Sequence, residues 1–298
     1  MRLAFAIAAL AVGALGQDSG VPVRMVVTVE PHHGTQAPRL TRDDVMVFQD
    51  KDNRRPVIGW TPVLDAGLQL WVLIDDGADA VIGNQFGDLR KFILAQSSMV
   101  EIGLGYMHNG SVTAVHSLSA DHQSVAKALR LPLGEAGISA SPYLSLVDLV
   151  RKWPNTQRAR EVVIIASGID YLYGPGPENP YLQQAIDEAQ RAGVVVSSIY
   201  FGSVGHAGHS YWEINWGQNN LSQLADATGA EFYWQGMTNP VSIRPYLDDV
   251  GQRINDQFVL TFDARHEGKA GLHPVHLQTE VPHVSLVAQK KVEIPGGR

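Results

Sequence analysis

A short apolar segment at residues 68–74, interrupted only by Gln69, ends abruptly at an acidic turn of sequence DDGAD, residues 75–79. A continuous apolar segment that stops at turn residues is typical of a strand buried on both faces, and such strands belong to parallel sheets. In open α/β sheets, ligands bind beyond the carboxyl ends of the strands. We therefore expect the three carboxylates of this turn to lie at the edge of the sheet where a binding site would form.

Two further segments, residues 161–167 and 194–201, have the same apolar character. They alternate with segments whose apolar residues recur at helical spacing, which predict helices at 84–98, 121–131, 142–153, 181–192, 220–228 and 242–256. An Asn-Gly pair at 109–110, between two apolar segments, predicts an antiparallel hairpin. This alternation favours an α/β fold with a doubly wound, mostly parallel, Rossmann-like sheet.

Both ends of the chain have the composition of β-strands. Residues 17–66 and 256–298 contain short β-branched and apolar segments separated by Pro, Gly, Asp and Asn. Each end is too small to form a core of its own. We therefore expect the two ends to pack together as one β subdomain appended to an α/β domain of residues 67–255.

The first sixteen residues have the features of a secretory signal peptide. Arg2 precedes a small and apolar segment that ends in a small-x-small pattern at Gly16. A short membrane anchor is the alternative, but the apolar segment falls short of the about 20 residues that a membrane-spanning helix needs. We expect removal of residues 1–16, a mature protein without a transmembrane segment, and a periplasmic or secreted location.

Composition excludes several classes of function. The chain has no cysteine, so it contains neither a disulfide nor a thiolate metal site. Its formal net charge is −7 and it has no basic stripe, which disfavours nucleic-acid binding.

The order of the predicted elements resembles the von Willebrand factor A fold. In that fold an apolar strand is followed by a D-x-S-x-S turn, a helix, a hairpin, further helices and a second apolar strand that ends in S-D-G. More narrowly, the chain is similar to the exported, von Willebrand factor A-related proteins of acidobacteria. This similarity rests on LTRDDVMVFQDKDNRRPVIGWTPV at 40–63, LSQLADATGAEFYW at 221–234 and YLDDVGQRINDQFVLTFDA at 246–264.

The resemblance implies a metal-ion-dependent adhesion site at the edge of the sheet. Its ligand positions are occupied here by Asp75, Gly77, Asp79, Ser141 and Ser167. The motif is degenerate, because Gly77 supplies no hydroxyl and Ser167 stands where the family has an aspartate. The oxygen donors that remain suit Mg²⁺ or Ca²⁺. The alternative is that Asp75 and Asp79 only cap the helix that follows.

A second group of residues is a candidate for partner contact. Exposed Tyr and Trp dominate binding hot spots, although most Trp residues fill a core. The segment 202–217, predicted as a loop, is aromatic and follows a buried strand, so it should lie at the same edge as the acidic turn. We assign partner binding to Asp76, Asp170, Tyr211, Trp212 and Trp216.

Three functions from different classes are compatible with these features. The first is an exported, non-enzymatic, adhesion-like module that binds a protein through the carboxyl-terminal rim of the sheet. The second is a structural or scaffolding component of an envelope assembly. The third is a hydrolase built on Ser167, which lacks the G-x-S-x-G motif. A zinc pair at His206 and His209 would need a helix, and the glycines around them favour a loop.

Overall fold

The computed structural model describes residues 20–32, 34, 37–134, 140–174, 176–202, 210–266 and 270–296. The predicted signal peptide at 1–16 and the histidines 206 and 209 lie outside the described residues.

A six-stranded sheet forms the centre of the molecule, with strand order β10-β9-β8-β5-β6-β7. All neighbours are parallel except β6 and β7, which form the predicted hairpin. Asn109 and Gly110 both have positive φ, as a tight two-residue hairpin turn requires. The strands are β5 (Leu68–Asp75), β6 (Val100–His108), β7 (Ser111–Ser119), β8 (Ala159–Ala166), β9 (Val194–Tyr200) and β10 (Phe232–Tyr233).

Strand β5 is central, and all eight of its residues are buried. Gln69, the one polar interruption, is satisfied inside the protein. Its Oε1 accepts a hydrogen bond from Trp153 Nε1 at 2.8 Å, and its Nε2 donates to Glu101 Oε2 at 2.9 Å. A polar side chain is tolerated there because both of its ends are bonded.

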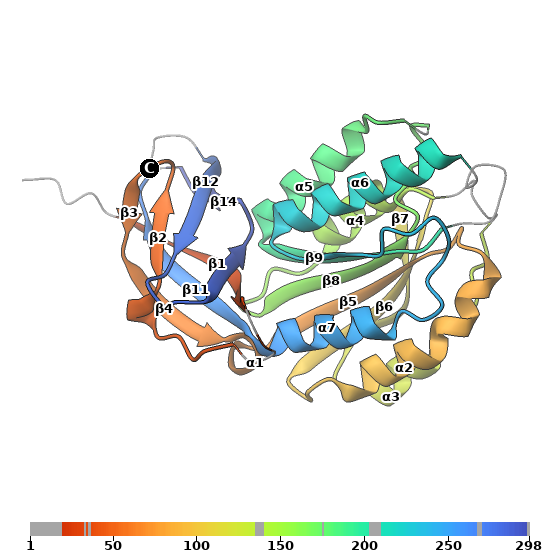
Figure 1. Ribbon diagram of the computed structural model, residues 1–298, viewed down its shortest axis with the longest axis horizontal. Coiled ribbons are helices and arrows are strands. Elements are labelled where there is room, and N and C mark those ends of the chain that lie inside the picture. The colour runs from red at the N-terminus through yellow and green to blue at the C-terminus, as the bar shows by residue number, and fades with distance from the viewer. Residues whose placement is uncertain are drawn as a thin grey trace, which may run out of the picture.

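Helices cover both faces of the sheet (Figure 1). The core on one face is closed by α2 (Phe86–Ala95), α3 (His122–Lys127) and α7 (Arg244–Asn255). The core on the other face is closed by α4 (Pro142–Lys152), α5 (Pro180–Ala192) and α6 (Tyr211–Thr228). The predicted doubly wound α/β fold is thereby confirmed. No helix among the described residues combines the length and the apolar character needed to cross a membrane.

The two ends of the chain build a β-sandwich at the amino-terminal ends of the parallel strands (Figure 1). Its sheets have the orders β13-β1-β11-β4 and β14-β12-β2-β3, so each sheet combines strands from both ends of the sequence. Apolar residues such as Val27, Val47, Leu260 and Phe262 form the core between them. The strands are β1 (Val21–Pro31), β2 (Met46–Gln49), β3 (Asn53–Arg55), β4 (Val57–Pro62), β11 (Gln257–Ala264), β12 (Gly271–Gln278), β13 (Val284–Ala288) and β14 (Lys291–Ile294).

Three short helical turns complete the described elements: η1 (Arg42–Asp44), α1 (Val63–Ala66) and η2 (Ala80–Gln85). Two sequence-based boundaries were wrong. Helix α3 ends at Lys127 rather than at 131, and Pro132 disfavours helical backbone at the residue before it. Helix α6 begins at Tyr211, so the aromatic segment is its first two turns and not a loop. Ile214, Leu221 and Leu224 place apolar groups on the buried side of α6, a periodicity that extends the helix toward its amino end.

Candidate functional site

The chain changes direction across the sheet at strand β5. It first adds β6 and β7 on one side of β5 and then returns to add β8 and β9 on the other side. Such a switch point opens a crevice at the carboxyl ends of the strands. We call this end of the sheet the rim. It includes the segments that follow β5, β8, β9, β10 and α3. Asp75 ends β5 and Ser167 directly follows β8, so both lie at the switch point.

Asp75 is buried at the switch point. Its Oδ1 accepts a hydrogen bond from Gly77 N at 2.8 Å, while its Oδ2 is buried and has no hydrogen-bond partner among the described residues. Burial raises the pKa of Asp75 from 3.8 to about 7. A carboxyl group in this setting binds a proton readily near neutral pH, and the proton would neutralise the charge that burial disfavours.

Asp76, a predicted partner-binding residue, is held by an internal ion pair. Arg130 Nη1 lies 2.7 Å from Asp76 Oδ1, and Leu133 N donates to the same oxygen at 3.0 Å. The Arg130 guanidinium also lies 3.8 Å from the centre of the Tyr106 ring, a favourable cation–π distance. The pairing of Arg130 with Asp76 was missed at the sequence level, because no local pattern relates residues so far apart in the chain.

The other predicted ligands are also engaged. Asp79 caps η2, since its carboxylate accepts a hydrogen bond from Val81 N at 2.7 Å. This is the alternative to metal binding that the sequence offered for Asp79. Ser141 Oγ donates to Asp170 Oδ2 at 3.0 Å, and Ser167 Oγ accepts from Ile169 N at 3.4 Å.

Asp170 closes its own loop. Its Oδ1 accepts from Leu172 N at 2.9 Å and from Tyr173 N at 3.2 Å, and burial raises its pKa. Asp170 therefore shapes the segment that presents Leu172 and Tyr173.

These residues do not fit a divalent cation. Mg²⁺ takes six ligands in octahedral geometry and Ca²⁺ takes six to eight oxygens, several of which can be water, but both ions need protein carboxylates to balance their charge. Among the carboxylates, Asp76 is neutralised by Arg130 and Asp79 caps η2. Asp75 alone keeps a buried oxygen without a hydrogen bond, and burial raises its pKa to about 7, so little negative charge is left to balance a divalent cation. Within the described residues, no three His, Cys, Asp or Glu side chains gather as a metal site would require.

A contact between two glycines sets the position of helix α6 against the rim. A Cβ on Gly217 would lie 2.1 Å from Ser167 O, and one on Gly168, where φ is +73°, would lie 2.2 Å from Gly217 O. Only glycine allows the backbones to approach this closely. The contact fixes the amino-terminal end of α6, and with it the predicted aromatic residues, beside the end of β8.

The predicted aromatic residues differ in exposure. Tyr211 is 57% exposed and Trp212 is 65% exposed, and their rings meet edge to face with centres 5.8 Å apart. Trp216 is half-buried one turn further along α6. Tyr211 and Trp212 therefore present large apolar surfaces to solvent at the rim.

Exposed apolar side chains gather at the rim well beyond these two residues. Twelve large apolar side chains of the described residues are exposed. Nine belong to rim segments: Val81, Leu131, Leu133, Leu172, Tyr173, Tyr211, Trp212, Met237 and Val241. The other three are Ile58, Leu94 and Met99. The rim residues come from five separate segments, so no single stretch of sequence reveals the surface.

Comparison with known proteins gives similarity in structure only. No protein-family model and no curated protein matches this sequence. The chain is similar to an aerotolerance-related membrane protein from Bacteroides fragilis NCTC 9343, with 11% identity and a TM-score of 0.47 over 63% of this chain and 99% of that one. It is similar to a manganese-loaded Plasmodium vivax TRAP protein, with 11% identity and a TM-score of 0.44 over 85% of this chain and 100% of that one. It is also similar to the SpRpn10 VWA domain, with 12% identity and a TM-score of 0.42 over 62% of this chain and 95% of that one.

The central domain has a von Willebrand factor A-like fold. The order of strand, turn, helix, hairpin, helices and strand is the one that the resemblance predicted, with the switch point at β5. The fold alone does not determine a ligand, because one fold supports many functions.

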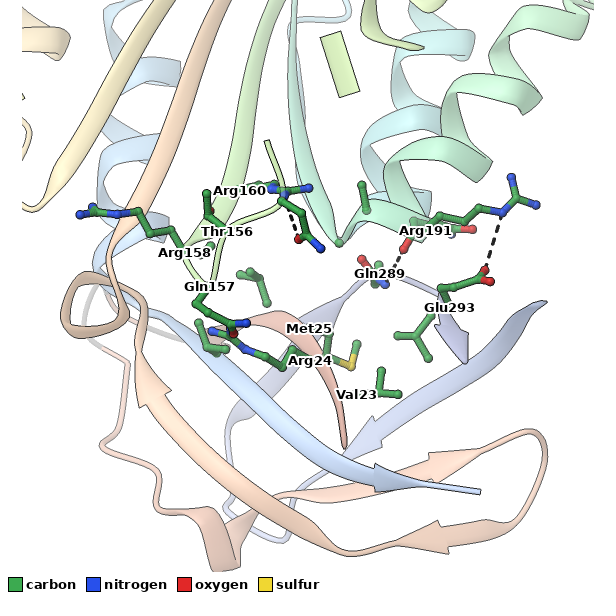
Figure 2. A pocket seen from close by; sticks show the side chains of 18 of the residues that line it. Val23, Arg24, Met25, Thr156, Gln157, Arg158, Arg160, Arg191, Gln289 and Glu293 are labelled. Atoms are coloured by element: carbon green, nitrogen blue, oxygen red, sulfur yellow. Dashed lines mark hydrogen bonds and ion pairs between the residues drawn. The ribbon is translucent and has the colours of Figure 1, made fainter. Parts of the chain in front are cut away.

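A pocket of about 280 Å³ lies at the other end of the von Willebrand factor A-like domain, where it meets the β-sandwich (Figure 2). Four arginines line it, and each has a partner within the chain. Arg24 donates to Gln157, Arg158 pairs with Glu101 at 3.7 Å, Arg160 donates to Pro154 O at 2.8 Å, and Arg191 pairs with Glu293 at 3.6 Å. Arg158 and Arg191 are thereby paired with acidic side chains, whereas Arg24 and Arg160 donate to neutral oxygens. The pocket is lined by residues of both units and so belongs to the domain junction.

Proposed function

We propose that this protein is an exported, non-enzymatic module that binds a protein partner through the rim of its von Willebrand factor A-like domain, in an adhesion-like manner. The observation that carries the proposal is the concentration of exposed apolar side chains at the rim. Of the twelve such residues in the described part of the chain, nine lie there, on the side of the domain away from the β-sandwich. Apolar surface gathered in one place is typical of interaction sites, whereas single exposed apolar residues are ordinary.

The polar residues of the rim support a role in binding rather than catalysis. The Ser141 hydroxyl and the Asp170 carboxylate bond to each other, and Asp170 also holds two backbone N–H groups. Asp76 is paired with Arg130. These groups stiffen the segments that carry the apolar side chains, and a preorganised surface loses less entropy on binding. The same engagement supports binding without a divalent ion.

Affinity capture with matched variants tests this function. The double variant Leu133→Ala/Tyr173→Ala removes two exposed apolar groups from the rim, where they are 78% and 55% exposed. The control Leu94→Ala/Met99→Ala removes two groups at the opposite end of the domain, where they are 43% and 49% exposed. Each purified protein is incubated with envelope and culture-medium extracts of the source organism, and retained proteins are quantified by mass spectrometry. We expect a partner that the wild type and the control retain and the rim variant loses. An identical set of retained proteins for all three would contradict the proposal.

Export is tested separately by fractionation and by the mass of the mature protein. We expect the protein in the periplasm or medium, beginning at Gln17 after removal of residues 1–16. Full-length protein retained in the cytoplasm would contradict export and leave the binding proposal to its own experiment.

A further inference from the structure

A groove runs along helix α6 beside the edge strand β10. This groove is open to solvent and has a volume of about 520 Å³, within the range of about 300–1,000 Å³ that ligand pockets occupy. One side of α6 carries four of the lining residues, Trp212, Asn215, Trp216 and Asn219. They share this side because they are spaced three or four residues apart along the helix, in two adjacent rows. Phe232, from β10, and Gln235, from the segment after it, also line the groove.

The groove is polar but uncharged. Each of the described residues that line it has an aromatic, amide or hydroxyl side chain. Charged residues make up 18% of the whole chain, so their exclusion from this groove favours a neutral ligand.

Two of the amide groups have their orientation fixed by the protein. Asn215 Nδ2 donates to Tyr211 O at 2.8 Å, and Gln218 Nε2 donates to Gly236 O at 2.7 Å. Each of these bonds uses one of the two N–H donors of the amide, so each side chain offers a ligand its carbonyl oxygen and its second N–H. A ligand that carries O–H or N–H donors can bond to the two oxygens.

The remaining polar groups offer both donors and acceptors. The amides of Asn219 and Gln235 make no hydrogen bond within the part of the chain that the structure describes, and each amide carries one carbonyl oxygen and two N–H bonds. A sugar hydroxyl likewise donates one hydrogen bond and accepts others. The C–H groups on one face of a pyranose ring can pack against the electron-rich faces of Trp212, Trp216 and Phe232.

We propose that this groove binds a neutral carbohydrate chain. A proline-rich peptide also docks on aromatic grooves, but proline has no backbone N–H and would leave the oxygens of Asn215 and Gln218 without donors. The groove adjoins the protein-binding surface of the rim, because Tyr211 and Trp212 border both. Trp216 and Asn219 line only the groove, so substitutions of these two residues test carbohydrate binding by itself.

Binding of defined oligosaccharides tests the proposal. Cellotetraose, chitotetraose and maltotetraose are titrated into the full chain without its signal peptide, with a decaproline peptide as a competing probe. Binding is followed by tryptophan fluorescence and isothermal titration calorimetry. The variants are Trp216→Ala, Trp216→Phe and Asn219→Ala, and thermal unfolding shows whether each remains folded. The Leu94→Ala/Met99→Ala variant is the control.

We expect at least one oligosaccharide to bind the wild type and the control. Trp216→Ala and Asn219→Ala should each weaken that binding by about tenfold or more, and Trp216→Phe should weaken it less because it keeps a ring. The proposal is overturned if no oligosaccharide binds at millimolar concentration, or if binding survives both Trp216→Ala and Asn219→Ala. Decaproline binding that both variants abolish, without oligosaccharide binding, would assign the groove to a proline-rich partner instead. None of these results alters the capture experiment for the rim, which uses other residues.

Discussion

The two ends of the six-stranded sheet differ in which side chains they bury and which they expose to solvent. At the amino-terminal end, the β-sandwich covers the strands, and Arg253 joins the two units by pairing with Glu30 of β1. Glu161, at the start of β8, is fully buried there, and burial raises its pKa from 4.5 to about 8. At the rim, the charged side chain of Asp76 is also paired, but large apolar side chains remain in solvent.

This difference separates residues that hold the fold from residues available to a partner. A covered end can keep charges only where they are paired, because burying an uncompensated charge is costly. Exposed apolar groups contribute little to folding, so their presence at one end points to another use. The difference can be tested by altering each end in turn.

The largest loss of stability is expected at the junction. Arg253→Met should lower the free energy of unfolding by about 3 kcal/mol or more, because it leaves Glu30 without its cation in a partly buried site. The Arg253 side chain is only 12% exposed. The control is Arg244→Met on the same helix, whose pair with Asp248 at 3.4 Å is 60% and 68% exposed. It should cost at most about 0.5 kcal/mol. Equal losses in urea unfolding would contradict the role of Arg253 as a tie between the units.

A smaller loss is expected at the rim. Arg130→Met should lower the free energy of unfolding by about 2 kcal/mol, because Asp76 then becomes a buried carboxylate without a counter-charge. The double variant Arg130→Met/Asp76→Asn should lose less unfolding free energy than the sum of the losses in the two single variants, because neither position then holds an unpaired charge. Strict additivity in a double-mutant cycle would show that Asp76 does not depend on Arg130.

The stability of the junction should also depend on pH through Glu161. Its folded pKa, about 8, lies above its ordinary value of 4.5, so between these values the native state retains a proton that the unfolded state has lost. The wild type should therefore lose stability as pH rises from about 5 to 8, relative to Glu161→Gln, by at least about 1 kcal/mol. Parallel curves of unfolding free energy against pH for the two proteins would refute this assignment.

The smallest effect is expected from metal ions. Millimolar Mg²⁺ or Ca²⁺ should leave the melting temperature of the wild type unchanged, because an ion that does not bind the native state cannot stabilise it. Asp75→Ala measured with the same ions is the control. A rise of several degrees in the wild type that Asp75→Ala abolishes would establish a metal site at the rim.

The sequence predicts much of the fold because its signals are local. The apolar segment before Asp75, the Asn109-Gly110 turn and the segment of β8 each specify an element through neighbouring residues. The exchange of strands between the two ends of the chain was predictable because neither end can bury a core alone.

The site was harder to predict because it depends on contacts between distant residues. The pairing of Asp76 with Arg130 and the bond from Ser141 to Asp170 join positions that no spacing rule connects. The apolar rim is assembled from segments whose exposure is set by the fold, so residues such as Leu133 look ordinary in the sequence. Contact of the aromatic segment with a partner stays a prediction, and the helical state of this segment was missed because the glycines before it favoured a loop.

The most direct test of the central claim is the affinity of the captured partner for the rim. The dissociation constant is measured by biolayer interferometry for the wild type, for Leu133→Ala/Tyr173→Ala and for Leu94→Ala/Met99→Ala, each with EDTA and with Mg²⁺. We predict that the rim variant binds at least about tenfold more weakly, that the control binds as the wild type does, and that EDTA changes none of the three values. Equal affinity of the rim variant and the wild type, or binding that EDTA abolishes, would contradict a metal-independent binding surface at the rim.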